Sequence, residues 1–544
     1  MKAAKRIEVY DTTLRDGAMG MGVSFSTAGK VRLVERLDRI GFQFVEGGFP
    51  GSGPKDMDFI DAVRRLRLST VTVAAFGSTR LAHAKAATDN NLLRLLRAGT
   101  PVVTVFGKAW RLHVTDVLRT TRDENLAMIA DTVRFLKRKG RKVIFDAEHF
   151  YDGYKDDPSF AMDAAAAAVD AGCAAVVLCD TNGGCLPHEV FEITRKVVES
   201  AAVPVGIHAH NDAGMAAANS IEAVRAGAVH VQGTVNGYGE RAGNANLCTV
   251  IPTLELKLGR RCIGRESLRQ LRGVSLFVDD LANLRPDERQ PYVGAGAFAH
   301  KAGMHVDAVQ KNPRTFEHVP PDAVGNERSV LLSEGSGRSS VLLKAIEMGM
   351  DGLEKDSDEL RAVVAELKHM ESRGYAFEAA NASFQILVQK ILKKHRPFFG
   401  LEGFRVIVEK RSRAEPCISE ATIKVRVNDR IAHTVGEGDG PVEALDRALR
   451  NALTRFYPQI ATVLLTDFRV RILDPKEATR ATTRVLIESS DGKRNWGTVG
   501  VSPNIIEASW EALVDSIEYK LFEDEKLARR PEGRSARRQA SRRS

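Results

Sequence analysis

Two histidines one residue apart, His208 and His210, are the residues whose types and spacing most directly indicate chemistry in this chain. They follow a short apolar run, 203–207, that has the composition of a β-strand. Side chains at positions i and i+2 of a strand point to the same side. Both imidazoles would therefore project together from the strand end and could bind one cation, although two partly exposed loop histidines would give the same pattern.

The region before residue 260 alternates short apolar runs with amphipathic segments, which is the rhythm of a parallel α/β fold. Strands are predicted at 7–10, 44–47, 71–76, 102–106, 143–146, 174–179, 203–207 and 229–235. Helices are predicted between them, as at 27–40, 56–66, 115–139, 158–171, 187–200 and 213–226. Eight such units in about 250 residues match a (β/α)₈ TIM barrel. A doubly wound open sheet is the alternative, but no Gly-x-Gly-x-x-Gly follows the first strand.

Polar residues stand at or directly after the carboxyl end of every predicted strand. They include Asp16 after the first strand, Glu46 at the end of the second, Glu148 after the fifth, Thr181 after the sixth and Asn244 after the eighth. In a TIM barrel these strand ends meet at one mouth, where the active site lies. A single polar loop would mean little, but polar ends on all strands predict a common site.

The residue types at these ends suit a divalent metal. A carboxylate (Asp16), two imidazoles (His208 and His210) and an amide oxygen (Asn244) can hold Mn²⁺, Mg²⁺, Co²⁺ or Zn²⁺ and leave coordination positions open. An open site of this kind can chelate a 2-oxo acid through its keto and carboxylate oxygens and polarise the carbonyl.

Four further residues are predicted to serve that chemistry. Arg15, next to the metal aspartate, could stabilise the oxyanion that forms when the carbonyl is attacked. Thr181 could hydrogen-bond the substrate carboxylate, and Glu46 is also assigned to substrate binding. Glu148 could transfer a proton or simply pair with a neighbouring cation.

Composition and charge exclude several other classes. The formal net charge is +9, but seven arginines and one glutamate after residue 526 supply +6 of it. The segment 524–544 is therefore predicted to be a disordered basic tail, and no basic stripe with interleaved aromatics indicates nucleic-acid binding. The chain contains no run of 18 apolar residues, so no membrane span is predicted. Six cysteines without a Cys-x-x-Cys pair, and no signal-peptide core, predict a cytoplasmic protein with reduced thiols.

Several of these segments resemble known signatures. Residues 11–17, 208–212 and 239–244 are similar to motifs of the acyl-CoA aldol/Claisen family, which includes isopropylmalate, homocitrate and citramalate synthases and, more distantly, hydroxymethylglutaryl-CoA lyase. Residues 22–26, 46–52, 75–80 and 146–153 resemble the citramalate synthase branch. The resemblance extends to about residue 520. It implies condensation of acetyl-CoA with a small 2-oxo acid, pyruvate in that branch, with metal ligands at Asp16, His208, His210 and Asn244 and substrate contacts at Arg15, Glu148 and Thr181.

The part after the barrel also resembles this family. Helices are expected at 262–281, and residues 296–307 resemble a linker subdomain whose histidine, here His305, would lean over the barrel mouth and help to deprotonate the acetyl group. Some relatives place a tyrosine nearby, where this chain has Phe316. The expected domains are a catalytic barrel, helical linker subdomains and an α+β regulatory domain, followed by the tail, at 1–260, 261–398, 399–523 and 524–544.

The regulatory domain is predicted from a change of pattern. Helices at 356–372 and 376–394 precede strands at 404–409, 421–427, 463–472 and 484–488, with helices at 442–456 and 507–521. The glycine-rich segment 436–441 is interpreted as a turn and a helix start, because no Lys-Ser/Thr follows it. By resemblance, this domain binds a product amino acid, isoleucine, at the interface of a homodimer.

Three alternative functions remain open from the sequence. Isopropylmalate or homocitrate synthase would differ in the size of the 2-oxo acid pocket. A hydroxyacyl-CoA lyase is disfavoured by the regulatory-type domain, and a non-catalytic effector-binding protein by the ring of polar strand ends. One departure from the family is clear: Met19 and Met21 replace a usual glutamine and glutamate. Methionine lacks a hydrogen-bond donor, so a slower or altered enzyme is expected rather than an inactive one.

Overall fold

The computed structural model describes residues 6–50, 54–301, 303–331, 337–350, 352–410, 412–474 and 481–528. The chain divides into two compact units, Met1–Phe298 with Glu317–Arg328 and Ala299–Phe316 with Ser329–Ser544. Within the described residues, no helix is both long enough and apolar enough to cross a membrane. The expected domain boundaries at 260 and 398 remain a prediction.

The first unit contains a closed barrel of parallel strands in sequential order. The strands are β1 (Glu8–Asp11), β2 (Phe44–Gly48), β3 (Thr72–Ser78), β4 (Val102–Lys108), β5 (Lys142–Glu148), β6 (Ala175–Asp180), β7 (Val205–Ala209) and β8 (His230–Gly233). β8 pairs with β1 and closes the barrel. The predicted (β/α)₈ barrel is confirmed, and the open sheet is excluded.

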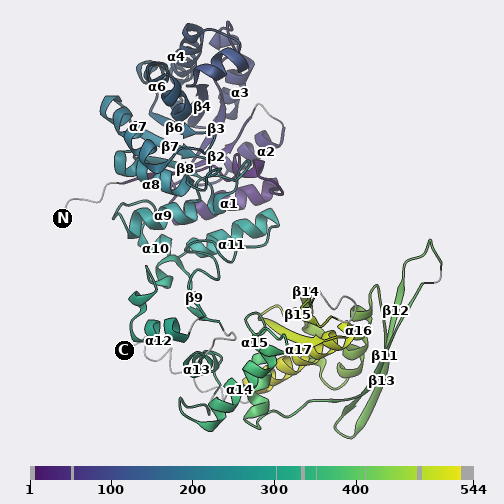
Figure 1. Cartoon of the computed structure of the whole chain (residues 1–544). Helices are drawn as coiled ribbons and strands as arrows, with labels where there is room; N and C mark the ends of the chain where they lie inside the picture. The colour runs from purple at the N-terminus through teal and green to yellow at the C-terminus, as the bar shows by residue number, and fades with distance from the viewer. Residues whose placement is uncertain are drawn as a thin grey trace, which may run out of the picture. The chain divides into compact units, whose positions relative to one another are not determined.

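Helices surround these strands (Figure 1). They are α1 (Thr27–Ile40), α2 (Pro54–Val63), α3 (Asn90–Ala98), α4 (Arg122–Arg138), α5 (Phe150–Asp156), α6 (Pro158–Ala171), α7 (Pro187–Ser200) and α8 (Ala216–Ala226). The helix predicted over 115–139 is wrong at its start, since a separate π-helical turn, His113–Val117, precedes α4. The physical reason is the Thr121 side chain, which accepts a hydrogen bond from Glu124 N and so begins a new helix.

The barrel strands are predictable because they are buried on both faces. Every residue of β2, β6, β7 and β8 is buried, so these strands lack an alternating pattern. β6 is an almost continuous apolar run, whereas β2 and β8 include the buried polar residues Glu46, His230 and Gln232. Below the mouth, the interior of the barrel is filled by one apolar cluster. Its members are Tyr10, Phe44, Ala74, Val102, Ile144, Ala175, Val177 and Cys179. The polar strand ends are therefore left facing the mouth above a packed core.

Three helices follow the barrel within the first unit. They are α9 (Leu247–Leu256), α10 (Arg265–Leu268) and α11 (Leu271–Ala282). The last two agree with the helices expected over 262–281. Helix α11 packs against the segment that follows β8, as described below.

The second unit begins with β9 (Ala299–His300), which pairs in parallel with β10 (Ser329–Val330). Helices and two antiparallel sheets make up the rest (Figure 1). The helices are α12 (Gly303–Lys311), α13 (Arg338–Glu347), α14 (Asp358–Ser372) and α15 (Asn381–Ile391). One sheet contains β11 (Gly400–Glu409), β12 (Ile418–Val427) and β13 (Arg430–Gly438), and the other β14 (Leu464–Ile472), β15 (Thr483–Ser490) and β16 (Asn495–Ser502). Helices α16 (Pro441–Leu453) and α17 (Ile505–Ala528) complete the α+β arrangement that the sequence predicts.

Two sequence predictions in this unit need correction. The segment 436–441 begins as the end of strand β13 rather than as a turn; Gly436 packs so closely on α16 that a Cβ there would lie 2.4 Å from Ala448 N. Helix α17 also continues to Ala528, so residues 524–528 are helical and not part of a disordered tail. The ion pair between Lys520 and Asp524, one turn apart, stabilises that extension. The rest of the predicted tail, 529–544, lies outside the described residues.

Candidate metal centre and active site

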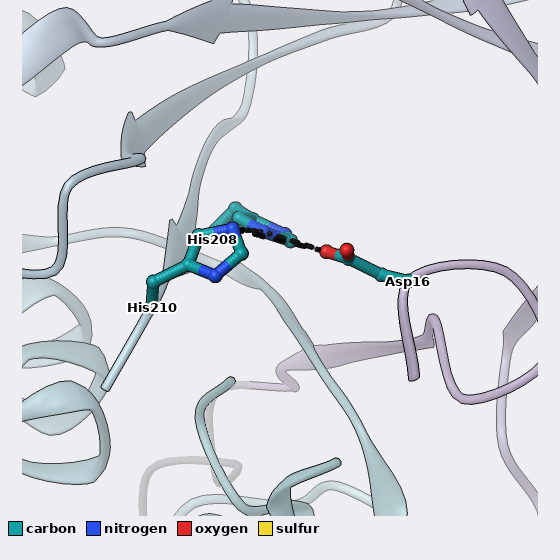
Figure 2. A group of neighbouring side chains, drawn as sticks. All are labelled: Asp16, His208 and His210. Carbon is teal, nitrogen blue, oxygen red and sulfur yellow. Dashed lines mark hydrogen bonds and ion pairs between the residues drawn. The ribbon is translucent and has the colours of Figure 1, made fainter. Parts of the chain in front are cut away.

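Three of the predicted metal ligands meet at the barrel mouth (Figure 2). Asp16 lies in the loop after β1, while His208 belongs to β7 and His210 follows it directly. His208 Nε2 lies 3.2 Å from Asp16 Oδ2 and 3.4 Å from His210 Nε2, and His210 Nε2 lies 3.9 Å from Asp16 Oδ2. One ligand atom from each residue lies within 4.8 Å of the others, a spacing at which a single ion could be held.

The fourth predicted ligand, Asn244, lies next to His210, and its role as a ligand remains a prediction. It forms a β-bridge with His210 and is 2% exposed. Its Nδ2 donates to the Tyr238 carbonyl at 3.3 Å, whereas its Oδ1 is buried without a hydrogen-bond partner in the described chain. A buried amide oxygen without a partner costs free energy unless it coordinates or accepts something. The donor set of a carboxylate, two imidazoles and this oxygen therefore fits a divalent cation.

Gln232 orients one of the imidazoles, and the sequence reasoning missed it. Its Nε2 donates to Asp146 Oδ1 at 3.0 Å, which leaves its Oε1 to accept from His208 Nδ1 at 2.9 Å. His208 Nε2 is then the ring nitrogen that faces Asp16. Outer-shell contacts of this kind fix the tautomer of metal-binding histidines. The only signal in the sequence was a polar residue at the centre of an apolar strand.

The charges of the three groups are coupled. Burial alone would raise the pKa of Asp16, but the positive charge of Arg15 and the hydrogen bond with His208 lower it overall. Burial opposes the charged form of His208, yet Asp16 raises the pKa of that imidazole. Burial, and then the neighbouring His208, lower the pKa of His210 to about 4. His210 is therefore neutral at pH 7 and has a lone pair available for a metal, as a ligand imidazole must.

Arg15 is held beside this site by contacts on two sides. Its Nε donates to Glu46 Oε1, and its Nη1 lies 3.4 Å from Asp16 Oδ1. The guanidinium carbon lies 3.8 Å from the centre of the Phe76 ring, in a cation–π arrangement. Glu46 is fully buried and also accepts from the Tyr10 hydroxyl at 2.9 Å. The structure therefore places Glu46 as a partner of Arg15, while its expected substrate contact remains a prediction.

A cavity of about 450 Å³ opens above the three ligands. Arg15, Glu148 and Thr181 line it, together with an aromatic wall formed by Phe49, Phe76 and Phe106. Met19 also lines the cavity, whereas Met21 is fully exposed and does not. Of the two departures from the family pattern, only Met19 can therefore contact a ligand there.

Glu148 and Thr181 have partners that the sequence did not specify. Lys108 donates to Glu148 Oε2, so the cation pairing that the sequence left open is observed. The backbone N–H of His149 donates to Thr181 Oγ1 at 2.9 Å. That bond occupies the oxygen as an acceptor and leaves the hydroxyl proton to be donated into the cavity.

His305 belongs to the second compact unit, on α12. Its exposed imidazole stacks on the ring of Phe316, with 4.0 Å between ring centres. Phe316 thus contacts the histidine beside which a tyrosine was expected. The catalytic role assigned to His305 remains a prediction.

Comparisons with known proteins place this geometry in a family. Three family descriptions match successive parts of the chain: "HMGL-like" over residues 6–274, "Homocitrate synthase post-HMGL domain-like" over 292–375, and "LeuA allosteric (dimerisation) domain" over 378–521.

Relatives that match along the full length identify the family more narrowly than these three descriptions do. The chain is 50% identical to an (R)-citramalate synthase of Geobacter sulfurreducens, covering 96% of this chain and 98% of that protein. It is 49% identical to an (R)-citramalate synthase of Aquifex aeolicus, covering 96% and 99%. A 2-isopropylmalate synthase of Methanocaldococcus jannaschii is 28% identical, covering 96% of each chain. Identity near 50% along almost the whole length shows that this chain belongs to the (R)-citramalate synthase family.

Proposed function

We propose that this protein condenses acetyl-CoA with pyruvate and water, giving (R)-citramalate and free CoA. The observation that carries the proposal is the Asp16–His208–His210 cluster beside Arg15 at the mouth of the barrel. The names of the relatives near 50% identity support it, because 2-isopropylmalate synthases are more distant.

Each residue at the cavity has a role in this proposal. A divalent ion bound by Asp16, His208, His210 and Asn244 would polarise the keto group of the 2-oxo acid and make it electrophilic. The Arg15 guanidinium donates hydrogen bonds to the oxygen on which negative charge develops. Because Glu46, Asp16 and Phe76 already hold that guanidinium, little reorganisation is needed during the reaction.

Two other groups orient the reactants. The Thr181 hydroxyl, whose oxygen already accepts from His149 N, donates a hydrogen bond to the substrate carboxylate. Glu148, whose Oε2 accepts a hydrogen bond from Lys108, is the first candidate base for the acetyl methyl group. We propose His305 as the second candidate base.

Pyruvate is expected to be the preferred 2-oxo acid. Its side chain is a methyl group, whereas 2-oxoisovalerate carries an isopropyl group, and each extra methylene in a fitted apolar pocket changes binding by about 1–3 kcal/mol. The Phe76 and Phe106 rings limit the room beside Arg15, with 5.3 Å between their centres. We expect kcat/KM for pyruvate to exceed that for 2-oxoisovalerate by at least about tenfold, measured as CoA thiol released from acetyl-CoA.

The same assay separates the alternatives. A kcat/KM for 2-oxoisovalerate above that for pyruvate would assign the chain to isopropylmalate synthesis. A kcat/KM for 2-oxoglutarate above that for pyruvate would assign it to homocitrate synthesis. Cleavage of a hydroxyacyl-CoA without any condensation would indicate a lyase. Purified enzyme that releases no thiol with any 2-oxo acid, although it binds metal, would refute the proposed function.

We further propose that residues 399–523 form a regulatory domain that binds isoleucine in a homodimer. Support comes from the match of residues 378–521 to the allosteric, dimerisation domain description. Citramalate supplies carbon for isoleucine, so the end product is the logical inhibitor. Coupling between two such sites is typically about 1–3 kcal/mol, which corresponds to a 5–150-fold change in apparent affinity.

The test of regulation should use the full-length chain. Val499 and Val501 of β16 pack in the same core as α14 and α15, so deletion from residue 404 would expose that core. Isoleucine is expected to inhibit thiol release at concentrations where leucine does not. Light scattering should give the mass of a dimer for the full-length protein. Inhibition by leucine alone would contradict the isoleucine assignment.

A further inference from the structure

The loop Val235–Asn244, here called the β8 loop, carries the fourth candidate ligand and has little regular structure of its own. Asn236 has φ 64°, a left-handed conformation that is uncommon for a residue with a side chain. Gly237 and Gly243 also have positive φ values, of 72° and 92°. Arg241 is a fourth such position, with φ 56°. A loop with four such positions needs outside contacts to stay in one conformation.

Helix α11 supplies those contacts. Asp279 is 3% exposed, and its Oδ1 accepts from Asn236 Nδ2 at 2.6 Å and also from the Tyr238 hydroxyl. The Ser275 carbonyl accepts from Asn236 Nδ2 at 2.9 Å, and Ser275 Oγ donates to Asn236 Oδ1 at 2.7 Å. Gln290 Nε2 donates to the same oxygen at 3.1 Å. Two side chains of the β8 loop are thus tied to one helix that lies outside the barrel.

Tyr238 connects these contacts to the candidate ligand. Its carbonyl accepts from Asn244 Nδ2 at 3.3 Å, and the Gly237 carbonyl accepts from Asn244 N at 3.0 Å. The space around the amide is tight, since a Cβ on Gly239 would lie 2.2 Å from Asn244 Nδ2. With the amide nitrogen held in this way, the oxygen that remains is the buried Oδ1 without a partner among the described residues.

We infer that Asp279 is a positioning residue of the metal site, which acts through Tyr238 and Asn236 to hold the Asn244 amide oxygen in place. The inference rests on the proposed metal site. Asp279 does not line the cavity and lies beyond residue 274, where the HMGL-like match ends. The barrel alone would therefore lack part of the support for its own site.

The experiment measures Mn²⁺ affinity of the metal-stripped, full-length chain by isothermal titration calorimetry, so that it does not depend on turnover. Asp279→Leu removes both acceptor bonds and is expected to weaken Mn²⁺ binding about 10–100-fold, the usual effect of losing an outer-shell contact. Asp279→Asn keeps one acceptor oxygen, and it should restore the affinity to within a few fold of wild type. Asp280→Asn, on the exposed neighbour, is the matched control and should leave the affinity unchanged.

Two further variants separate positioning from general stability. Tyr238→Phe deletes only the hydroxyl that donates to Asp279, so it tests the same connection if Asp279→Leu does not fold. Weaker Mn²⁺ binding by this variant supports the inference, and wild-type binding overturns it. In an Asn244→Ala background, Asp279→Leu should have little further effect on Mn²⁺ affinity, because the two residues act through the same ligand. Fully additive losses would overturn the inference.

A failure of the metal site itself can be told apart from these results. A wild-type chain that binds no Mn²⁺ overturns the inference together with the proposed site. A chain that binds Mn²⁺ normally but releases no CoA from acetyl-CoA and pyruvate refutes only the proposed function.

Discussion

His210→Ala is expected to abolish thiol release from acetyl-CoA and pyruvate while the barrel stays folded. The change removes one of the two candidate imidazole ligands, so metal affinity should fall by more than the roughly 10–100-fold that an outer-shell contact is worth. The fold should tolerate it, because burial and the neighbouring His208 already keep this imidazole neutral, with a pKa lowered to about 4. Metal content by mass spectrometry, melting temperature and activity are measured on the same preparation.

Two controls make this result specific. His188→Ala, an exposed histidine on α7, should change neither metal content nor activity. Treatment of the wild-type enzyme with EDTA should remove activity, and added Mn²⁺ or Co²⁺ should restore it. Full activity in metal-free, EDTA-treated enzyme would show that the Asp16–His208–His210 cluster does not serve catalysis through a metal.

Arg15→Lys is expected to lower kcat about 10²–10³-fold, the range observed when one oxyanion donor is removed. Lysine keeps the positive charge next to the buried Glu46 but loses the planar fork that can contact Glu46, Asp16 and the substrate together. Arg15→Ala is a poorer test, because a buried carboxylate left without its partner typically costs about 3–5 kcal/mol of stability. Steady-state kinetics and melting temperature should be measured together.

Companion variants define what Arg15 does. Arg39→Lys, an exposed arginine on α1, should leave kcat unchanged. Glu46→Gln keeps an acceptor for Arg15 Nε but removes the charge, so its kcat should fall less than that of Arg15→Lys. An Arg15→Lys enzyme with wild-type kcat would remove Arg15 from the catalytic assignment.

The sequence by itself determined the barrel and the centre of its site. Parallel strands covered on both faces are mostly apolar, so short apolar runs such as those of β6 and β7 were recognisable as strands. The barrel topology then required the ends of β1 and β7 to meet at one mouth, which brought Asp16 to His208 and His210. The change to a period-2 pattern at 404–409 and 421–427, within β11 and β12, likewise predicted a separate α+β unit.

Only the tertiary structure decided the contacts that orient these groups. The bonds of Gln232 with His208 and Asp146, of Lys108 with Glu148, and of Asp279 with Tyr238 join residues between 24 and 86 positions apart in the chain. A local pattern carries no information on such pairs, because each depends on the register of strands and on the direction in which a packed helix presents its side chains. The glycine at position 436 of β13 also depends on the tertiary structure. A Cβ there would clash with the backbone of α16, and the residues next to Gly436 in the sequence do not indicate that contact.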